Sequence, residues 1–76
     1  MSLMSMMSMP HTHEVRYREL SYAQKRAIRE QLEASFDWDD GKYAEGASDH
    51  SIAAEVGVGW SLIRYVRERD YGHLAP

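Results

Sequence analysis

The sequence predicts an all-α fold, a compact domain of three helices preceded by a disordered N-terminal arm. Three observations support this fold class. Apolar residues recur at helical spacing in three segments, two of these segments begin at a serine that can cap a helix, and glycines separate or follow them. The 76 residues include no cysteine, so the fold must rest on one small apolar core. We place the arm at residues 1–14 and the domain at residues 15–76.

The N-terminal arm is low in complexity. All five methionines lie in residues 1–13, interleaved with serine, and no periodic apolar face offsets the entropy of ordering. Residues 14–20 alternate Val15 and Tyr17 with Arg16 and Arg18, which predicts a short extended segment. Basic arms of this kind can reach into a minor groove, and a surface strand that pairs with a partner is the alternative.

The first helix is expected to begin after Ser21 and to end near Phe36 or Trp38. Ser21 and Gln24 have the spacing of a capping box, in which each side chain accepts from the other residue's backbone N–H. Ile28, Leu32 and Phe36 follow at intervals of four and form one apolar stripe. This stripe predicts the face that the first helix turns toward the core.

The connector at residues 37–47 is predicted to be a loop, because it combines two glycines with four acidic residues. Trp38 and Tyr43 are expected to fold back over the core. A calcium loop would require glycine at the sixth position and glutamate at the twelfth. Counting from Asp37, glycine is fifth and Ser48 is twelfth, so a solvated turn is the better interpretation.

The second helix is expected to start after Ser48, whose hydroxyl is a good N-cap. Ile52, Ala53 and Val56 form its inner face, and small Ala53 lets the next helix approach closely. Gly57 can then supply the left-handed backbone that a tight turn needs. These features predict a short helix that ends in a sharp turn.

The third helix is expected to run from about Trp60 to Asp70 or Tyr71, with Gly72 as its stop. Ile63 and Val66 lie three residues apart and would anchor it to the core. The opposite face then carries Ser61, Arg64, Tyr65 and Glu68, flanked by Trp60 and Arg67.

The order of residues from Ser48 to Arg69 resembles the bacterial and phage helix-turn-helix family. The resemblance implies a wingless domain of three helices whose last helix reads duplex DNA in the major groove, in transcriptional or mobile-element regulation. It also implies a cytoplasmic protein that is nucleoid-associated when bound to DNA. Two features depart from the family pattern: Gly59 stands where a polar cap is usual, and Trp60 and Leu62 are large apolar residues beside the groove face.

The candidate DNA-binding residues fall into three groups. Ser61, Arg64 and Tyr65 would read bases, and Trp60 would contact a thymine methyl or sugar, pack on the core, or meet a protein partner. The phosphate contacts would be Arg67, Arg69 and Lys25, with Arg16 and Arg18 from the arm. A continuous basic surface formed by Arg64, Arg67 and Lys25 would favour DNA binding. Two half-sites, and so a homodimer or a protein partner, are expected for tight binding.

Other functional classes find little support in the sequence. We expect no enzyme, because the chain has no nucleophile–base arrangement and no glycine-rich phosphate loop. His11 and His13 are too few to hold a metal, so no metal or other cofactor is expected. No apolar run approaches the length of a membrane span, and neither a membrane nor a small-molecule substrate is expected as a partner.

The distribution of charge leaves a second hypothesis open. The net charge is -3, and residues 30–55 carry eight acidic residues against Lys42 alone. Net acidity disfavours nucleic-acid binding unless the acidic segment faces away from the DNA. The alternative is a non-enzymatic protein-interaction module on the same fold, an adaptor or antagonist of a larger regulator, with Trp60 and Leu62 exposed to its partner.

Overall fold

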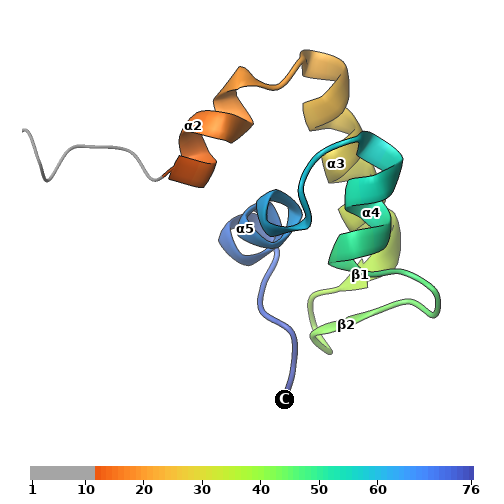
Figure 1. Cartoon of the computed structure of the whole chain (residues 1–76). Helices are drawn as coiled ribbons and strands as arrows, with labels where there is room; N and C mark the ends of the chain where they lie inside the picture. Colours follow the sequence, from red (N-terminus) through yellow and green to blue (C-terminus); the bar gives the residue numbers. More distant parts are fainter. Residues whose placement is uncertain (1–11) are drawn as a thin grey trace, which may run out of the picture.

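The computed structural model describes residues 12–76, which form four helices and a small antiparallel hairpin (Figure 1). The elements in chain order are α2 (Thr12–Glu19), α3 (Tyr22–Ser35), β1 (Phe36–Asp37), β2 (Lys42–Tyr43), α4 (Asp49–Val56) and α5 (Trp60–Asp70). The expectation of a mostly helical fold is confirmed. The finer expectation of a purely α-helical domain with three helices is wrong, because a further helix and a hairpin are present. Residues 1–11 of the expected arm lie outside the described residues.

The three expected helices form where their caps and apolar stripes predict them. Ser21 Oγ accepts from the backbone N–H of Gln24 at 3.1 Å, and Gln24 Oε1 accepts from the N–H of Ser21 at 3.2 Å. Ser48 and Ser51 form the same reciprocal box at the start of α4. Gly57 ends α4 with a φ of 86°, the left-handed conformation that a tight turn requires. α5 spans Trp60–Asp70, as expected.

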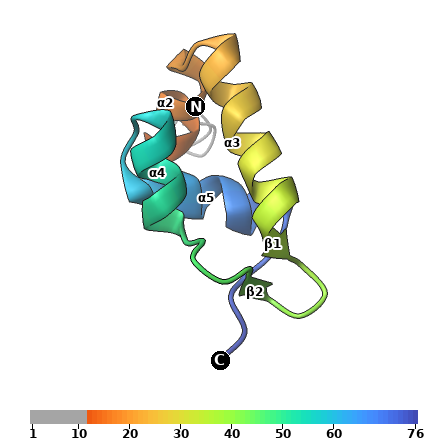
Figure 2. The ribbon, with the colours of Figure 1, turned by 90° about the vertical axis from the view of Figure 1, so that its right-hand side faces the viewer.

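The core lies where α5 crosses the pair formed by α3 and α4 (Figure 2). Its buried members come from all three helices and from β1: Ile28, Leu32, Phe36, Ile52, Ala53, Ile63 and Val66. The apolar stripe of the first predicted helix is therefore fully buried, as expected.

The segment predicted to be extended is instead the helix α2. A lone strand would have left its backbone groups without a neighbouring strand, whereas a helix satisfies them within the segment. The helical spacing also brings Glu14 and Arg18 into an ion pair one turn apart. No residue of α2 is buried, and the helix rests mainly on α5. Leu62, which the protein-interaction hypothesis placed at the surface, is buried, and Arg16 and Glu19 of α2 border a cavity beside it.

The connector forms a hairpin in which Phe36 pairs with Tyr43 and Asp37 with Lys42. The two aromatic rings are 5.2 Å apart and fill this end of the core, so Tyr43 packs as expected. The expectation for Trp38 is wrong, because 67% of it is exposed. The Asp37 carboxylate accepts from the N–H groups of Asp39 and Asp40, which closes a turn that leaves Trp38 in solvent.

Candidate functional site

The turn between α4 and α5 sets the position of the candidate site. The N–H groups of Gly57 and Val58 both donate to the carbonyl of Ala53, at 2.8 and 3.0 Å, so the chain reverses tightly. Ala53 is buried and Val58 packs against the core, which fixes α5 relative to α4. The outward face of α5 is thus held on a rigid support rather than on a loop.

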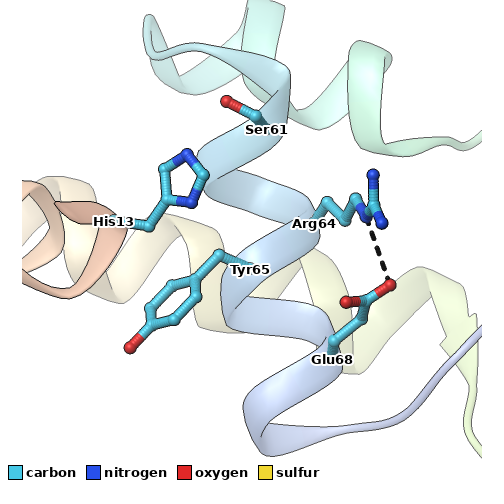
Figure 3. A pocket seen from close by; sticks show the side chains of 5 residues that line it. All are labelled: His13, Ser61, Arg64, Tyr65 and Glu68. Atoms are coloured by element: carbon cyan, nitrogen blue, oxygen red, sulfur yellow. Dashed lines mark hydrogen bonds and ion pairs between the residues drawn. The ribbon is translucent and has the colours of Figure 1, made fainter. Parts of the chain in front are cut away.

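The outward face of α5 borders a shallow cavity of about 290 Å³ (Figure 3). The side chains that line it come from α2 and α5: His13, Ser61, Arg64, Tyr65 and Glu68. The structure therefore brings together the three residues predicted to read bases. His13 and Tyr65 lie on one side of the face, with ring centroids 5.8 Å apart, and Arg64 and Glu68 lie on the other.

Arg64 is the most accessible cation of this face, with 55% of its side chain exposed. Its Nε donates to Glu68 Oε2 at 3.2 Å, an ion pair one helical turn apart. A pair this exposed is weak, because water screens it and both side chains keep their mobility. Arg64 can therefore exchange Glu68 for a ligand at little cost, although Glu68 also places a negative charge on the surface where an anion would bind.

Trp60 lies at the start of the same helix and is 43% exposed. Its indole stacks on the imidazole of His50 from α4, with centroids 4.8 Å apart and an angle of 23° between the rings. Of the interpretations that the sequence left open for Trp60, burial in the core does not apply. The ring is held in place yet presents an apolar surface beside Ser61.

Arg67 occupies a different environment from Arg64, since only 1% of it is exposed. Its Nε and Nη2 donate to the two oxygens of Asp49 at 3.0 and 3.1 Å, and its Nη1 donates to the carbonyl of Gly72 at 2.8 Å. The hydroxyl of Tyr43 donates to Asp49 as well. This buried network ties β2, α4, α5 and the C-terminal tail together, and Arg67 is not placed to contact a phosphate.

The electrostatics of the network follow from burial and pairing. Burial alone raises the pKa of Asp49, but the hydrogen bonds from Arg67 and Tyr43 outweigh burial and lower the pKa below its usual 3.8. Burial, together with the hydrogen bond to Asp49, raises the pKa of the Tyr43 hydroxyl. Asp49 therefore stays ionised and Tyr43 stays neutral in the folded protein, so the charge of Arg67 is balanced.

The remaining predicted cations are spread over other surfaces. Arg69 pairs with Asp70 at 2.8 Å and lies over the rings of Tyr17 and Tyr65. Lys25 also lies over the Tyr17 ring, 5.6 Å from its centroid, and lines a cavity between α2 and α3 whose lining includes no residue of α5. Arg64, Arg67 and Lys25 therefore do not form the continuous basic surface that would favour DNA binding over a protein-interaction role.

The two cations of the predicted arm lie on α2. Arg18 is paired with Glu14, as noted above. Arg16 is exposed and borders a cavity beside Val58, Gly59 and Leu62, next to the start of α5. Gly59 provides no side-chain cap to that helix. Arg16 thus adds positive charge beside the positive end of the α5 dipole.

Sequence reasoning missed the role of Asp49 and the contribution of His13 to the face. The burial of Arg67 could have been predicted from helical spacing. Position 67 is four residues after Ile63 and one after Val66, on the side of the helix that faces the core. No comparable signal existed for His13, since its position depends on the docking of α2.

Within residues 12–76, no group of three or more metal-binding side chains converges. Among the same residues, no helix combines the length and apolar character required to cross a membrane. No protein-family model, curated protein or solved structure is significantly similar to the chain, so the functional argument rests on the geometry of the α5 face.

Proposed function

We propose that the chain binds duplex DNA through the outward face of α5, with Ser61 and Arg64 directed to base edges. The observation that carries the proposal is the left-handed Gly57 turn, which holds α5 across a packed core while leaving Ser61 and Arg64 on the surface. A helix supported in this way can enter a major groove, and arginine can donate two hydrogen bonds to guanine.

The contacts around this face follow from the same geometry. Trp60 would meet a sugar or a thymine methyl, and Arg16 would meet a phosphate near the uncapped start of α5. Tyr65 would contribute its ring edge beside His13. We assign no DNA contact to Arg67, since its guanidinium is buried and donates its hydrogen bonds to the Asp49 carboxylate and the Gly72 carbonyl. Two units would be required for a tight complex, because one face of this size buries little surface.

The biological role that fits this proposal is transcriptional or mobile-element regulation by a DNA-binding protein rather than an enzyme. Such a protein would work in the cytoplasm and associate with the nucleoid when bound.

The proposal is tested with Arg64→Ala and the matched control Lys42→Ala, which removes one exposed cation from β2, away from α5. Fluorescence anisotropy is measured on fragments selected by the wild-type protein and on random duplexes. We expect Arg64→Ala to weaken the selected complex by about 1–3 kcal/mol and to reduce the preference for selected over random DNA. Unchanged affinity and preference in Arg64→Ala would overturn the assignment.

A protein-interaction module remains the second candidate, favoured by the exposed Trp38 beside three acidic residues of the hairpin. In that case, Asp39→Lys/Asp40→Lys would disturb capture of a partner protein, while no variant of α5 would change DNA binding above the background.

A further inference from the structure

The hairpin presents a fixed acidic loop, which we define as residues 37–40. Asp37 closes the loop through the N–H groups of Asp39 and Asp40. The C-terminal tail holds its base, because the N–H of Ala75 donates to the carbonyl of Gly41 at 2.8 Å. Gly41 has a φ of 67°, and a Cβ there would lie 2.8 Å from the Ala75 nitrogen, so this close approach requires glycine. The loop therefore displays Trp38 in an ordered setting.

A cationic and aromatic cavity, which we call the α2–α3 groove, lies between α2 and α3 and runs along α3 from Tyr22 to Glu33. Its volume is about 330 Å³. The residues that line it are Tyr17, Tyr22, Lys25, Arg26, Arg29, Glu30 and Glu33. Tyr22 is 78% exposed, the highest value among the exposed large apolar residues of the described segment 12–76, and Lys25 lies over the ring of Tyr17.

The groove and the acidic loop have complementary charge. Three cations line the groove against two carboxylates, which leaves an excess of one positive charge. Arg26 and Glu30 pair with each other at 2.9 Å, and Glu33 accepts from the hydroxyl of Tyr71 at 2.8 Å, so Lys25 and Arg29 provide the cationic character of the groove. The loop has three acidic residues and no cation. An indole held among carboxylates thus matches a surface that offers aromatic rings and ammonium or guanidinium groups.

The acidic loop cannot reach Tyr22 and Lys25 of the groove within one molecule. The groove extends along α3 to Glu33, but Tyr22 and Lys25 lie in the first turn of the helix. The loop follows the last turn, so the length of α3 separates the loop from Tyr22 and Lys25 (Figure 2). A helix of 14 residues is about 21 Å long. A second copy of the chain can bring them together.

We propose that the acidic loop of one copy docks into the α2–α3 groove of another, with Trp38 stacked between Tyr22 and Lys25. The contact is head-to-tail, so each copy keeps a loop or groove for a further copy unless the assembly closes into a ring. The residues Ser61 and Arg64 of the α5 face take no part in it. The proposal does not depend on DNA binding, although it would supply a second DNA-binding unit.

Charge reversal tests the contact directly. Lys25→Glu/Arg29→Glu makes the groove acidic, and Asp39→Lys/Asp40→Lys makes the loop basic. Sedimentation velocity on the full chain, from micromolar to millimolar concentration at low salt, should show association of the wild type that weakens as salt is added. Each variant alone should lose association by about tenfold or more, because like charges then face each other, and an equimolar mixture should restore it.

A wild-type chain that stays monomeric throughout this range would overturn the proposal, as would a mixture that remains as dissociated as its components. Circular dichroism confirms that each variant is folded before the comparison. If the groove instead binds another protein, or residues 1–11 of the same chain, the wild type stays monomeric in this experiment. That result counts against the proposal.

The two tryptophans of the chain provide a matched pair of probes. Trp38→Ala is expected to reduce self-association by about tenfold or more, and Trp60→Ala is expected to leave it unchanged. In Trp60→Phe, the remaining Trp38 should shift its emission to shorter wavelength as the protein associates. Loss of self-association in Trp60→Ala but not in Trp38→Ala would contradict the docking mode. These experiments contain no DNA, so their failure is distinguishable from failure of the proposed DNA binding.

Discussion

Arg64 and Arg67 lie on the same helix, three residues apart, and each pairs with a carboxylate, yet their surroundings assign them opposite tasks. Arg64 is exposed and meets Glu68 through one hydrogen bond at the surface. Arg67 is buried and makes two hydrogen bonds to Asp49 and a third to the carbonyl of Gly72. The difference teaches that the helical face, rather than the residue type, decides whether an arginine on α5 is available to a ligand.

The energetic consequences of the two pairs also differ. An exposed ion pair contributes about 0–1 kcal/mol, because solvent competes for both charges. Removing one partner of a buried pair costs about 3–5 kcal/mol, since the other charge remains without compensation in a low dielectric. Among the described residues, no buried side-chain nitrogen or oxygen lacks a hydrogen-bond partner. Removing one member of the network around Arg67 would therefore leave buried polar atoms without a partner.

The largest expected effect is the loss of stability in Arg67→Ala. We expect its free energy of unfolding to fall by about 3–5 kcal/mol, which is comparable to the total stability of a domain of this size. Arg64→Ala is the matched control and should change stability by about 0.5 kcal/mol or less. Urea denaturation followed by circular dichroism measures both. Equal midpoints for the two variants would show that the buried network is not structural.

The same comparison is sharpened by replacing both charged partners. Asp49→Leu/Arg67→Met should be more stable than either single substitution, because no buried charge is then left unpaired. A double variant as unstable as Arg67→Ala would indicate that shape, rather than charge balance, dominates at this site.

The next effect is an acid-dependent loss of stability that originates at Asp49. Its pKa is below 3.8 in the folded protein and 3.8 in the unfolded chain, so the unfolded state binds the proton first as the pH falls. The stabilisation is complete well above pH 3.8 and declines as the pH drops through and below this value. Thermal unfolding measured between neutral pH and pH 3 should show the decline. The variant Asp49→Leu/Arg67→Met should lack the part of this acid-dependent loss of stability that originates at Asp49.

The smallest expected effect concerns Glu68, at the exposed pair. Glu68→Gln removes a negative charge from the α5 face and releases Arg64, so affinity for duplex DNA should rise by about 0.3–1 kcal/mol without a change in fold. Fluorescence anisotropy at fixed salt detects the change. Glu45→Gln, an exposed substitution in the turn after β2, should leave affinity within error. A decrease in affinity for Glu68→Gln would place Glu68 in base recognition instead.

The parts of the fold that depend on local signals were predictable from the sequence. The serine boxes that begin α3 and α4, the Gly57 turn and the apolar stripe ending at Phe36 each specify structure within a few residues. The helix α2 was not predictable, because it depends on packing against α5, a distant segment. Trp38 is exposed for a local reason, the turn that Asp37 closes, which the prediction of a loop did not specify. The alternation in residues 14–20 favours a strand, but a strand is stable only when a neighbouring strand pairs with it, and none does among residues 12–76.

The candidate site was predictable in part for the same reason. Ser61, Arg64 and Tyr65 lie together because helical periodicity alone places them on one face. The continuous surface of Arg64, Arg67 and Lys25 that would have favoured DNA binding is absent for two reasons. Arg67 lies on the core side of α5, and Lys25 belongs to the groove beside α2, whose position no local pattern in the sequence indicates.

The measurement that tests the central claim most directly is fluorescence anisotropy of the wild-type chain with random and genomic duplexes across a salt series. The account predicts binding that weakens steeply as salt rises and that favours some fragments over others, with the slope reporting the number of phosphate contacts. The absence of binding at low salt, where even weak electrostatic contacts should hold, would contradict a DNA-binding role for the α5 face.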